Sequence, residues 1–270
     1  MEKARHVFYL SDRTGKTAEA IGQSLLSQFG DYQFESKVYS FLDTIEKVKE
    51  AATIINQTSE TNKEESIVFN TIVNSDHQKI IAETNSCVID LFGEFISPLE
   101  QSLNTVSSYA SGMAHEKFEF QEYNARIDAI DFTLSYDDGV RFSEYEKADI
   151  VLLGVSRSGK SPTCIYLAMN FSVKAANYPL SEEQLDSGKL PDSLINNLDK
   201  IVGLTISPKQ LFEMRQKRRP GTEYSSFATC EKEIKQAKRL FEDYKIPFVE
   251  STSTSIEEIS VQLLKLKELI

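Results

Sequence analysis

The chain has 270 residues, 40% hydrophobic and 26% charged, which are values of a soluble globular protein and exclude a disordered or collagen-like chain. Its 30 Lys and Arg residues are outnumbered by 41 Asp and Glu residues, so the net charge is -11. This balance argues against nucleic acid and anionic membranes as partners, because proteins bind both of them through a predominantly positive surface.

Three cysteines, Cys87, Cys164 and Cys230, lie far apart and match neither a disulfide framework nor a zinc spacing. A reducing cytoplasm suits them. The first apolar run, Val7 to Leu10, is too short for a signal peptide or a membrane-spanning helix. We therefore expect a cytoplasmic protein.

Short apolar runs alternate with segments of helical period, which predicts parallel sheets flanked by helices. In the first half, strands are predicted at 6–10, 37–41, 66–73 and 87–92, with helices near 18–29, 44–57 and 76–84. Residues 104–122 lack clear periodicity and are expected to form an irregular connection. A helix follows over 123–134, and Asp137 to Gly139 is typical of a turn. Residues 1–140 are assigned to an N-terminal α/β domain.

A second α/β unit, residues 141–270, begins with the apolar run at 148–156. Its later strands are predicted at 175–180, 201–207 and 246–252, with helices between them. The last helix has an apolar stripe made of Ile256, Ile259, Leu263, Leu266 and Ile270. No internal repeat is visible. The predicted fold class is α/β, with two units whose sheets are mainly parallel.

The second unit contains a phosphate-loop pattern, since Gly154 is followed after four residues by Gly159, Lys160 and Ser161. Glycines let successive N–H groups turn inward around an anion, and the helix start adds partial positive charge. Lys160 adds a full charge, and Ser161 would hold a magnesium ion. The pattern predicts a P-loop kinase-like unit. The alternative is a strand-to-helix turn that contains Gly-Lys-Ser by chance.

An acid is missing downstream of this loop. Hydrolases of this class supply an apolar strand ending in Asp to organise magnesium, but the strands at 175–180 and 201–207 end without one. A motor or a switch GTPase is therefore disfavoured.

The segment 10–20 resembles half a phosphate loop, because Gly15, Lys16 and Thr17 are present but Leu10 replaces the leading glycine. It could place Asp12 and Thr14 at the mouth of a sheet. The alternative is that Ser11 or Asp12 caps the following helix.

A basic cluster lies at 209–219, where one acid, Glu213, is outnumbered by Lys209, Arg215, Lys217, Arg218 and Arg219. It could contact a phosphate or an acidic partner surface. We favour a solvated helix end, the commoner reason for such a charge run.

Five segments, 6–20, 123–139, 148–180, 201–215 and 246–260, follow one another as in the bacterial phosphoenolpyruvate synthase regulatory proteins, relatives of the pyruvate, phosphate dikinase regulatory proteins. The resemblance covers nearly the whole chain. "GVSR" joined to "GKSP" is its most specific motif.

This resemblance implies a bifunctional enzyme that acts on phosphoenolpyruvate synthase. One reaction moves the β-phosphoryl group of ADP to a threonine of the synthase, which inactivates it. The other uses inorganic phosphate to remove that group, releasing pyrophosphate. The family's nucleotide loop carries over to Gly154, Val155, Ser156, Arg157, Ser158, Gly159, Lys160 and Ser161.

Within this interpretation, Lys160 and Arg157 stabilise charge on the transferring group, and Asp12 orients the target hydroxyl. Asp137 and Asp138 are alternatives for that last role and for binding magnesium. The chain departs from the family pattern at Ser207, where Asp is expected, and at Arg13 and Lys16, where small or acidic residues are usual.

Two other functions stay open at this point. The loop could serve a small-molecule kinase that uses ATP, or a nucleotide-sensing module without catalysis. The catalytic base, the metal ligands and the oligomeric state, with a homodimer among the options, are not decided by the sequence.

Overall fold

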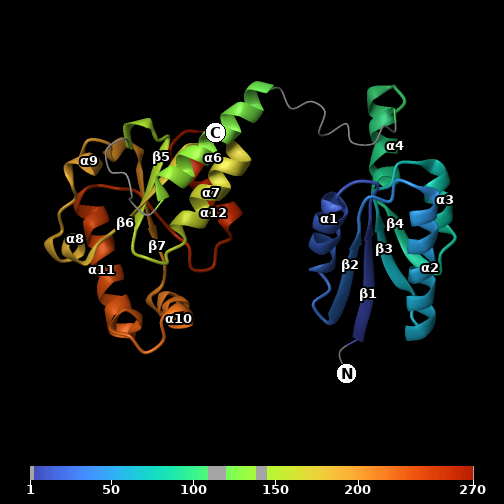
Figure 1. Cartoon of the computed structure of the whole chain (residues 1–270), viewed down its shortest axis with the longest axis horizontal. Helices are drawn as coiled ribbons and strands as arrows, with labels where there is room; N and C mark the ends of the chain where they lie inside the picture. The colour runs from blue at the N-terminus through green and yellow to red at the C-terminus, as the bar shows by residue number, and fades with distance from the viewer. Residues whose placement is uncertain (1–2, 109–119, 138–144, 270) are drawn as a thin grey trace. The chain divides into compact units, whose positions relative to one another are not determined.

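The computed structural model describes residues 3–108, 120–137 and 145–269, and the chain forms two compact units, 1–117 and 118–270. Each unit has one parallel four-stranded sheet with helices packed on both faces (Figure 1). The predicted fold class, two α/β units with parallel sheets, is confirmed.

The sheet of the first unit has the order β2-β1-β3-β4. Its strands are β1 (Lys3–Leu10), β2 (Tyr32–Tyr39), β3 (Ser66–Asn70) and β4 (Ser86–Asp90). Its helices are α1 (Lys16–Leu26), α2 (Ile45–Asn62), α3 (Ser75–Ala82) and α4 (Leu91–Leu103). Phe8 and Leu10 pack with α2 and α3, whereas Val7 and Tyr9 pack on the opposite face with α1. Helices on both faces explain why the second half of β1, from Val7 to Leu10, is a continuous apolar run.

The strand predictions in this unit are confirmed with shifted ends. The β2 strand begins at Tyr32 and stops at Tyr39, and β3 stops at Asn70 rather than at residue 73. Helix α4 was not predicted, because the apolar run of β4 continues into Leu91 and Phe92, and Pro98 interrupts the expected helical pattern.

The second sheet has the order β6-β5-β7-β8, which repeats the strand order of the first. Its strands are β5 (Ile150–Gly154), β6 (Ala175–Pro179), β7 (Ile201–Thr205) and β8 (Phe248–Glu250). Its α-helices are α6 (Phe120–Ser135), α7 (Lys160–Phe171), α8 (Glu182–Ser187), α9 (Asp192–Ile195), α10 (Pro208–Arg218), α11 (Phe227–Asp243) and α12 (Ile256–Leu266). Short 3-10 turns are η2 (Tyr145–Lys147), η3 (Leu198–Lys200) and η4 (Glu223–Ser225).

The central strand β5 is buried along its whole length. Ile150 and Leu152 face α7 and α12, and Val151 and Leu153 face α8 and α11. The last helix begins at a capping box formed by Ser255 and Glu258. Its predicted stripe is confirmed at its centre, where Ile259 and Leu263 are buried, while Ile256 and Leu266 are exposed.

The predicted helix over 123–134 lies within α6, which packs against α7 and β6. Because of this packing, α6 belongs to the second unit, whereas the sequence-based division at residue 140 assigned it to the first. Of the irregular connection expected at 104–122, residues 109–119 lie outside the described residues, as do Asp138 and Gly139 of the expected turn. Within the described ranges, no helix combines the length and the apolar character needed to cross a bilayer.

The three thiols differ in exposure, since Cys87 is exposed while Cys164 and Cys230 are buried. Burial raises the pKa of the Cys164 thiol and of the Cys230 thiol, so both stay protonated at neutral pH. We predict that a thiol reagent modifies Cys87 in the native protein and the other two only after denaturation. Counting modified thiols with and without urea, with Cys87→Ser as control, tests this. Rapid modification of two or more thiols in the native protein would contradict it.

Candidate functional site

The segment 154–161 joins β5 to α7, so the predicted strand, glycine-rich turn and helix start occur in the expected order. Gly154 ends the strand beside β7. A Cβ atom at this position would lie 2.3 Å from the backbone oxygen of Leu204, so a side chain cannot fit there. Gly159 has φ 95° and begins α7 in the left-handed region, which glycine adopts without strain. Both glycines therefore have steric reasons for their positions.

Lys160 is buried and its side chain folds back over the loop. The Nζ atom donates a hydrogen bond to the backbone oxygen of Val155 at 2.8 Å. Lys160 is also the first residue of α7, where the helix contributes partial positive charge. The loop thus concentrates positive charge at the carboxyl end of the sheet, where parallel α/β folds bind ligands.

Ser251 connects the loop to the end of β7. Ser158 is almost fully buried, and its backbone oxygen accepts a hydrogen bond from Ser251 Oγ at 2.9 Å. Ser251 Oγ also lies 3.1 Å from the backbone oxygen of Thr205, at the end of β7. The connection after β8 therefore ties the loop to the neighbouring strand.

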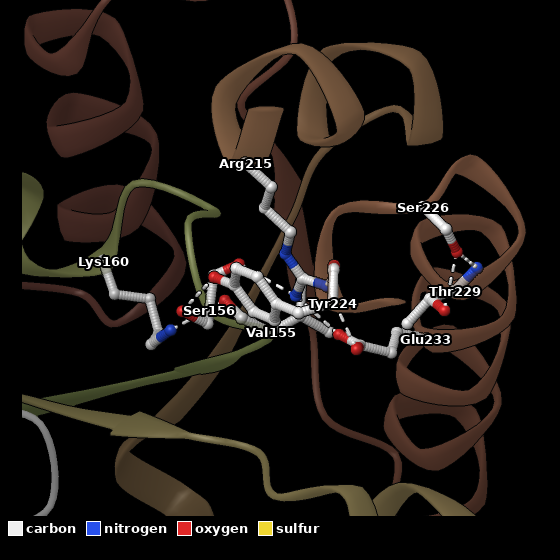
Figure 2. Close-up of polar contacts among 8 residues, drawn as sticks. All are labelled: Val155, Ser156, Lys160, Arg215, Tyr224, Ser226, Thr229 and Glu233. Atoms are coloured by element: carbon white, nitrogen blue, oxygen red, sulfur yellow. Dashed lines mark hydrogen bonds and ion pairs between the residues drawn. The ribbon is translucent and has the colours of Figure 1, made fainter. Parts of the chain in front are cut away.

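Arg215 corrects the interpretation of the basic cluster. Lys209, Lys217, Arg218 and Arg219 are exposed, as expected for a solvated helix end, but the Arg215 side chain is only 1% exposed. Arg215 points from α10 into the unit, with its Nη2 atom 3.2 Å from the backbone oxygen of Ser156 (Figure 2). One cation of the cluster thus reaches the candidate loop.

Glu233 of α11 makes two hydrogen bonds with this guanidinium, of 3.0 and 2.6 Å. Burial acts to lower the pKa of Arg215, but the hydrogen bond and charge of Glu233 outweigh it, so the pKa stays above its ordinary value. Ser226 caps α11 by accepting the N–H of Thr229 at 3.1 Å, which fixes the helix that carries Glu233 (Figure 2). The buried charge is therefore paired in bidentate geometry.

Tyr224 contacts both the arginine and the loop. Its ring centroid lies 4.1 Å from Arg215 Cζ, and its backbone oxygen accepts from Nη1 at 3.0 Å. Its hydroxyl lies 3.0 Å from Ser156 Oγ. Arg215 and Tyr224 together hold the backbone and the side chain of Ser156 (Figure 2). We call Arg215, Glu233 and Tyr224 the loop clamp.

Ser161, near the start of α7, belongs to a second polar network. The buried Asn177 of β6 has its Nδ2 atom 3.1 Å from Ser161 Oγ, and the same amide donates to Asp137 Oδ1. Asp137 lies two residues after the last residue of α6, Ser135. This network brings Asp137, one of the predicted alternatives, to the loop, whereas Asp138 lies outside the described residues.

Arg157 is exposed on the loop with φ 75°, a backbone conformation that is uncommon for a residue other than glycine. Ser207, at the expected Asp position, caps α10 by accepting the N–H of Gln210 at 3.3 Å. An aspartate could make the same cap, so the departure leaves the local fold intact.

Asp12 lies in the first unit, in a pocket of about 440 Å³ that it lines with Arg13, Phe41, Asp43, Val73, Asn74 and His77. The alternative interpretation, that Ser11 or Asp12 caps the next helix, is wrong. Helix α1 begins at Lys16 after Gly15 and has no side-chain cap. Ser11 Oγ instead accepts the N–H of Arg13 at 3.1 Å. The pocket lies at the carboxyl ends of the first unit's strands.

Sequence comparisons match residues 7–264 to a protein family described as kinase/pyrophosphorylase. A relative from Ectopseudomonas mendocina is 45% identical over 260 residues, which cover 96% of each chain. A relative from Marinobacter nauticus is 43% identical over the same length, and one from Pseudomonas aeruginosa is 43% identical over 264 residues, 98% of this chain and 96% of its own. All three are provisionally named phosphoenolpyruvate synthase regulatory proteins.

The loop clamp makes a prediction about stability. Arg215→Ala leaves the carboxylate of Glu233 without its partner, and breaking a buried pair in this way costs about 3–5 kcal/mol. Urea unfolding should show this loss, whereas Arg218→Ala, at an exposed position of the same helix, should change stability by less than about 0.5 kcal/mol. Equal unfolding midpoints for the two variants would show that the clamp does not stabilise the unit.

A second prediction follows from the close contact between Gly154 and the backbone of Leu204 in β7. Gly154→Ala should destabilise the protein by about 1–3 kcal/mol, since the new methyl group clashes with a backbone oxygen that cannot move away alone. Gly30→Ala is the control, because no heavy atom lies within 4 Å of a Cβ placed there. Thermal unfolding of both variants measures the difference. A Gly154→Ala variant as stable as wild type would refute the steric argument.

Proposed function

Because the chain belongs to the kinase/pyrophosphorylase family, as its sequence resemblance predicted, we propose that it regulates phosphoenolpyruvate synthase by adding and removing a phosphoryl group. Membership of this family supports a phosphotransferase activity in general. The proposed forward reaction transfers the β-phosphoryl group of ADP to a threonine hydroxyl and leaves AMP. The proposed reverse reaction transfers the phosphoryl group from phosphothreonine to inorganic phosphate and releases pyrophosphate.

The observation that carries this proposal is the position of Lys160. Its ammonium group is buried and held over the loop by the backbone oxygen of Val155. A group bound there would meet Lys160, the loop N–H groups and the start of α7 together. The β-phosphate of ADP and free phosphate carry the same chemical group, so one site could hold either of them.

In the proposed mechanism, Lys160 and the loop N–H groups bind the phosphoryl group and stabilise the charge that develops on it. Arg157, exposed on the same loop, adds a second cation once a substrate is bound. The loop clamp keeps Ser156 fixed, so the N–H groups do not have to reorganise during the transfer. This assigns Gly154, Val155, Ser156, Arg157, Ser158, Gly159, Lys160 and Ser161 to nucleotide binding.

The threonine hydroxyl must lose a proton to a base, and a carboxylate is the suitable group. We propose that Asp12, which lines a pocket of the first unit, orients the target hydroxyl for this step. Asp138 remains an alternative.

A magnesium ion fits the donor set beside the loop, where Ser161 Oγ and the Asp137 carboxylate both contact Asn177. When bound, such an ion would neutralise part of the phosphate charge and orient the transferring group. The cytoplasm, which holds ADP, inorganic phosphate and magnesium, is the proposed compartment.

The central prediction concerns the phosphoryl donor. Purified protein incubated with synthase and ADP labelled at the β-phosphate should label a threonine of the synthase. Unlabelled inorganic phosphate should then release the label as pyrophosphate. Lys160→Ala should lower the forward rate by at least about 100-fold, because it removes a charge from the transferring group.

The control is Lys235→Ala, which removes an exposed lysine from α11 and should leave the rate unchanged. Label on the synthase from γ-labelled ATP alone, or on a small molecule, would favour a kinase of another type. ADP binding that Lys160→Ala abolishes, with no transfer in the wild type, would identify a nucleotide sensor instead.

A further inference from the structure

The second unit lacks an acid where the strand next to a phosphate loop normally provides one. The β7 strand ends at Thr205, followed by Ile206 and Ser207, and Ser207 is used as a helix cap. Glu250 ends β8, one strand further from the loop. It is exposed and already contacts Lys238 at 3.6 Å and Thr252 at 2.8 Å. The described ends of β7 and β8 therefore offer the loop no carboxylate, and the nearby carboxylate of Glu233 is already paired with Arg215.

We infer that Asp137, two residues after α6, supplies the missing carboxylate of a magnesium site that Ser161 and the phosphates of a bound nucleotide complete. The inference deepens the proposed function, because it rests on nucleotide binding by the same loop. It places the acid on the β6 side of the loop, opposite the usual strand.

The geometry that carries it is the pair of hydrogen bonds at Asn177. Asn177 is only 1% exposed. Its side-chain amide nitrogen contacts both Asp137 Oδ1 and Ser161 Oγ. An NH₂ group has two hydrogens, so it can donate to both oxygens at once. Two oxygens that accept hydrogen bonds of about 3 Å from the same nitrogen lie at most about 6 Å apart. Asn177 therefore fixes a hydroxyl and a carboxylate beside each other at the start of α7.

The charges that act on the buried Cys164 thiol agree with this placement. Cys164 lies one turn after Lys160 on α7. Burial is the main cause of its raised pKa, the negative charge of Asp137 raises it further, and the positive charge of Lys160 opposes the shift. Both charges thus lie close enough to act on one buried thiol. Asp137 and Lys160 belong to a single electrostatic environment around α7.

The donor set suits magnesium and predicts how the ion is held. Magnesium prefers hard oxygen ligands and is bound through one or two carboxylates together with substrate phosphates. Among the described residues, no group of three or more His, Cys, Asp or Glu side chains could hold a metal ion. The protein alone should therefore bind the ion weakly, and binding should tighten when a nucleotide supplies further oxygens.

The test uses Mn²⁺, which accepts the same oxygen ligands and is detected by its EPR signal. Free Mn²⁺ is titrated with the full-length protein, with and without ADP. Wild type should bind Mn²⁺ more tightly with ADP than either protein or ADP does alone. Asp137→Asn and Ser161→Ala should each weaken that ternary binding by at least about 10-fold. Asp137→Glu, which keeps the carboxylate, should retain more affinity than Asp137→Asn.

Glu250→Gln is the matched control, since it removes the carboxylate at the end of β8 and should leave Mn²⁺ binding unchanged. Thermal unfolding of each variant checks that the unit is folded. Wild-type affinity for Mn²⁺ in Asp137→Asn, or a loss of affinity in Glu250→Gln alone, overturns the assignment.

A rate measurement separates a metal role from a base role. If Asp137 acts through the ion, raising the Mg²⁺ concentration should restore much of the transfer rate of Asp137→Asn. A lost rate that added Mg²⁺ does not restore, with Mn²⁺ affinity unchanged, would make Asp137 a base and overturn the inference. The Mn²⁺ titration needs no protein substrate. A protein that binds Mn²⁺ with ADP as expected but transfers nothing to the synthase would refute the proposed function and leave the metal site standing.

Discussion

The candidate site depends on the burial of Arg215. A guanidinium that is removed from water must have its charge paired, and Glu233 does so with two hydrogen bonds. Once paired, the same group donates to the backbone oxygen of Ser156 and stacks on Tyr224, whose hydroxyl contacts the Ser156 side chain. The position of the loop is therefore coupled to the packing of α10 against α11. A site for a multiply charged group needs such support, since donors that reorganise on binding lose much of their electrostatic effect.

Much of this arrangement could be predicted from the sequence, because local patterns determine it. Strands covered on both faces, such as β5, are continuous apolar runs, and the turn between Gly154 and Lys160 has a recognisable spacing. The loop clamp could not be predicted in this way. Arg215 stands among four exposed cations, and its partner Glu233 is 18 residues away on another helix. Nothing local distinguishes a buried arginine from its solvated neighbours. The link between Asp137 and Ser161 depends in the same way on Asn177, from a third element.

The two sheets share one strand order, although no repeat was visible in the sequence. Their first loops also correspond, since Arg13, Gly15 and Lys16 occupy the places of Arg157, Gly159 and Lys160. The two loops differ at the leading glycine of the pattern, where Leu10 replaces the equivalent of Gly154. Leu10 is buried in the core of its unit, and Lys16 points outward and pairs with Glu19 at 2.9 Å, whereas Lys160 folds back over its loop. Similar backbones thus present their lysines in opposite ways, and the first loop lacks the buried charge of the second.

The proposed chemistry gives a physical reason for pairing the acid of the site with a cation. A site that runs in both directions must accept two anionic groups, the β-phosphate of ADP and free phosphate. A carboxylate facing them at 4 Å would repel each by about 4 kcal/mol at an effective dielectric constant near 20. Thr205 and Ser207 are uncharged, so the β7 side imposes no such penalty. Asp137, held by Asn177 beside Ser161, can bind a cation there. The positive charge of the cation then attracts the phosphate groups that the carboxylate alone would repel.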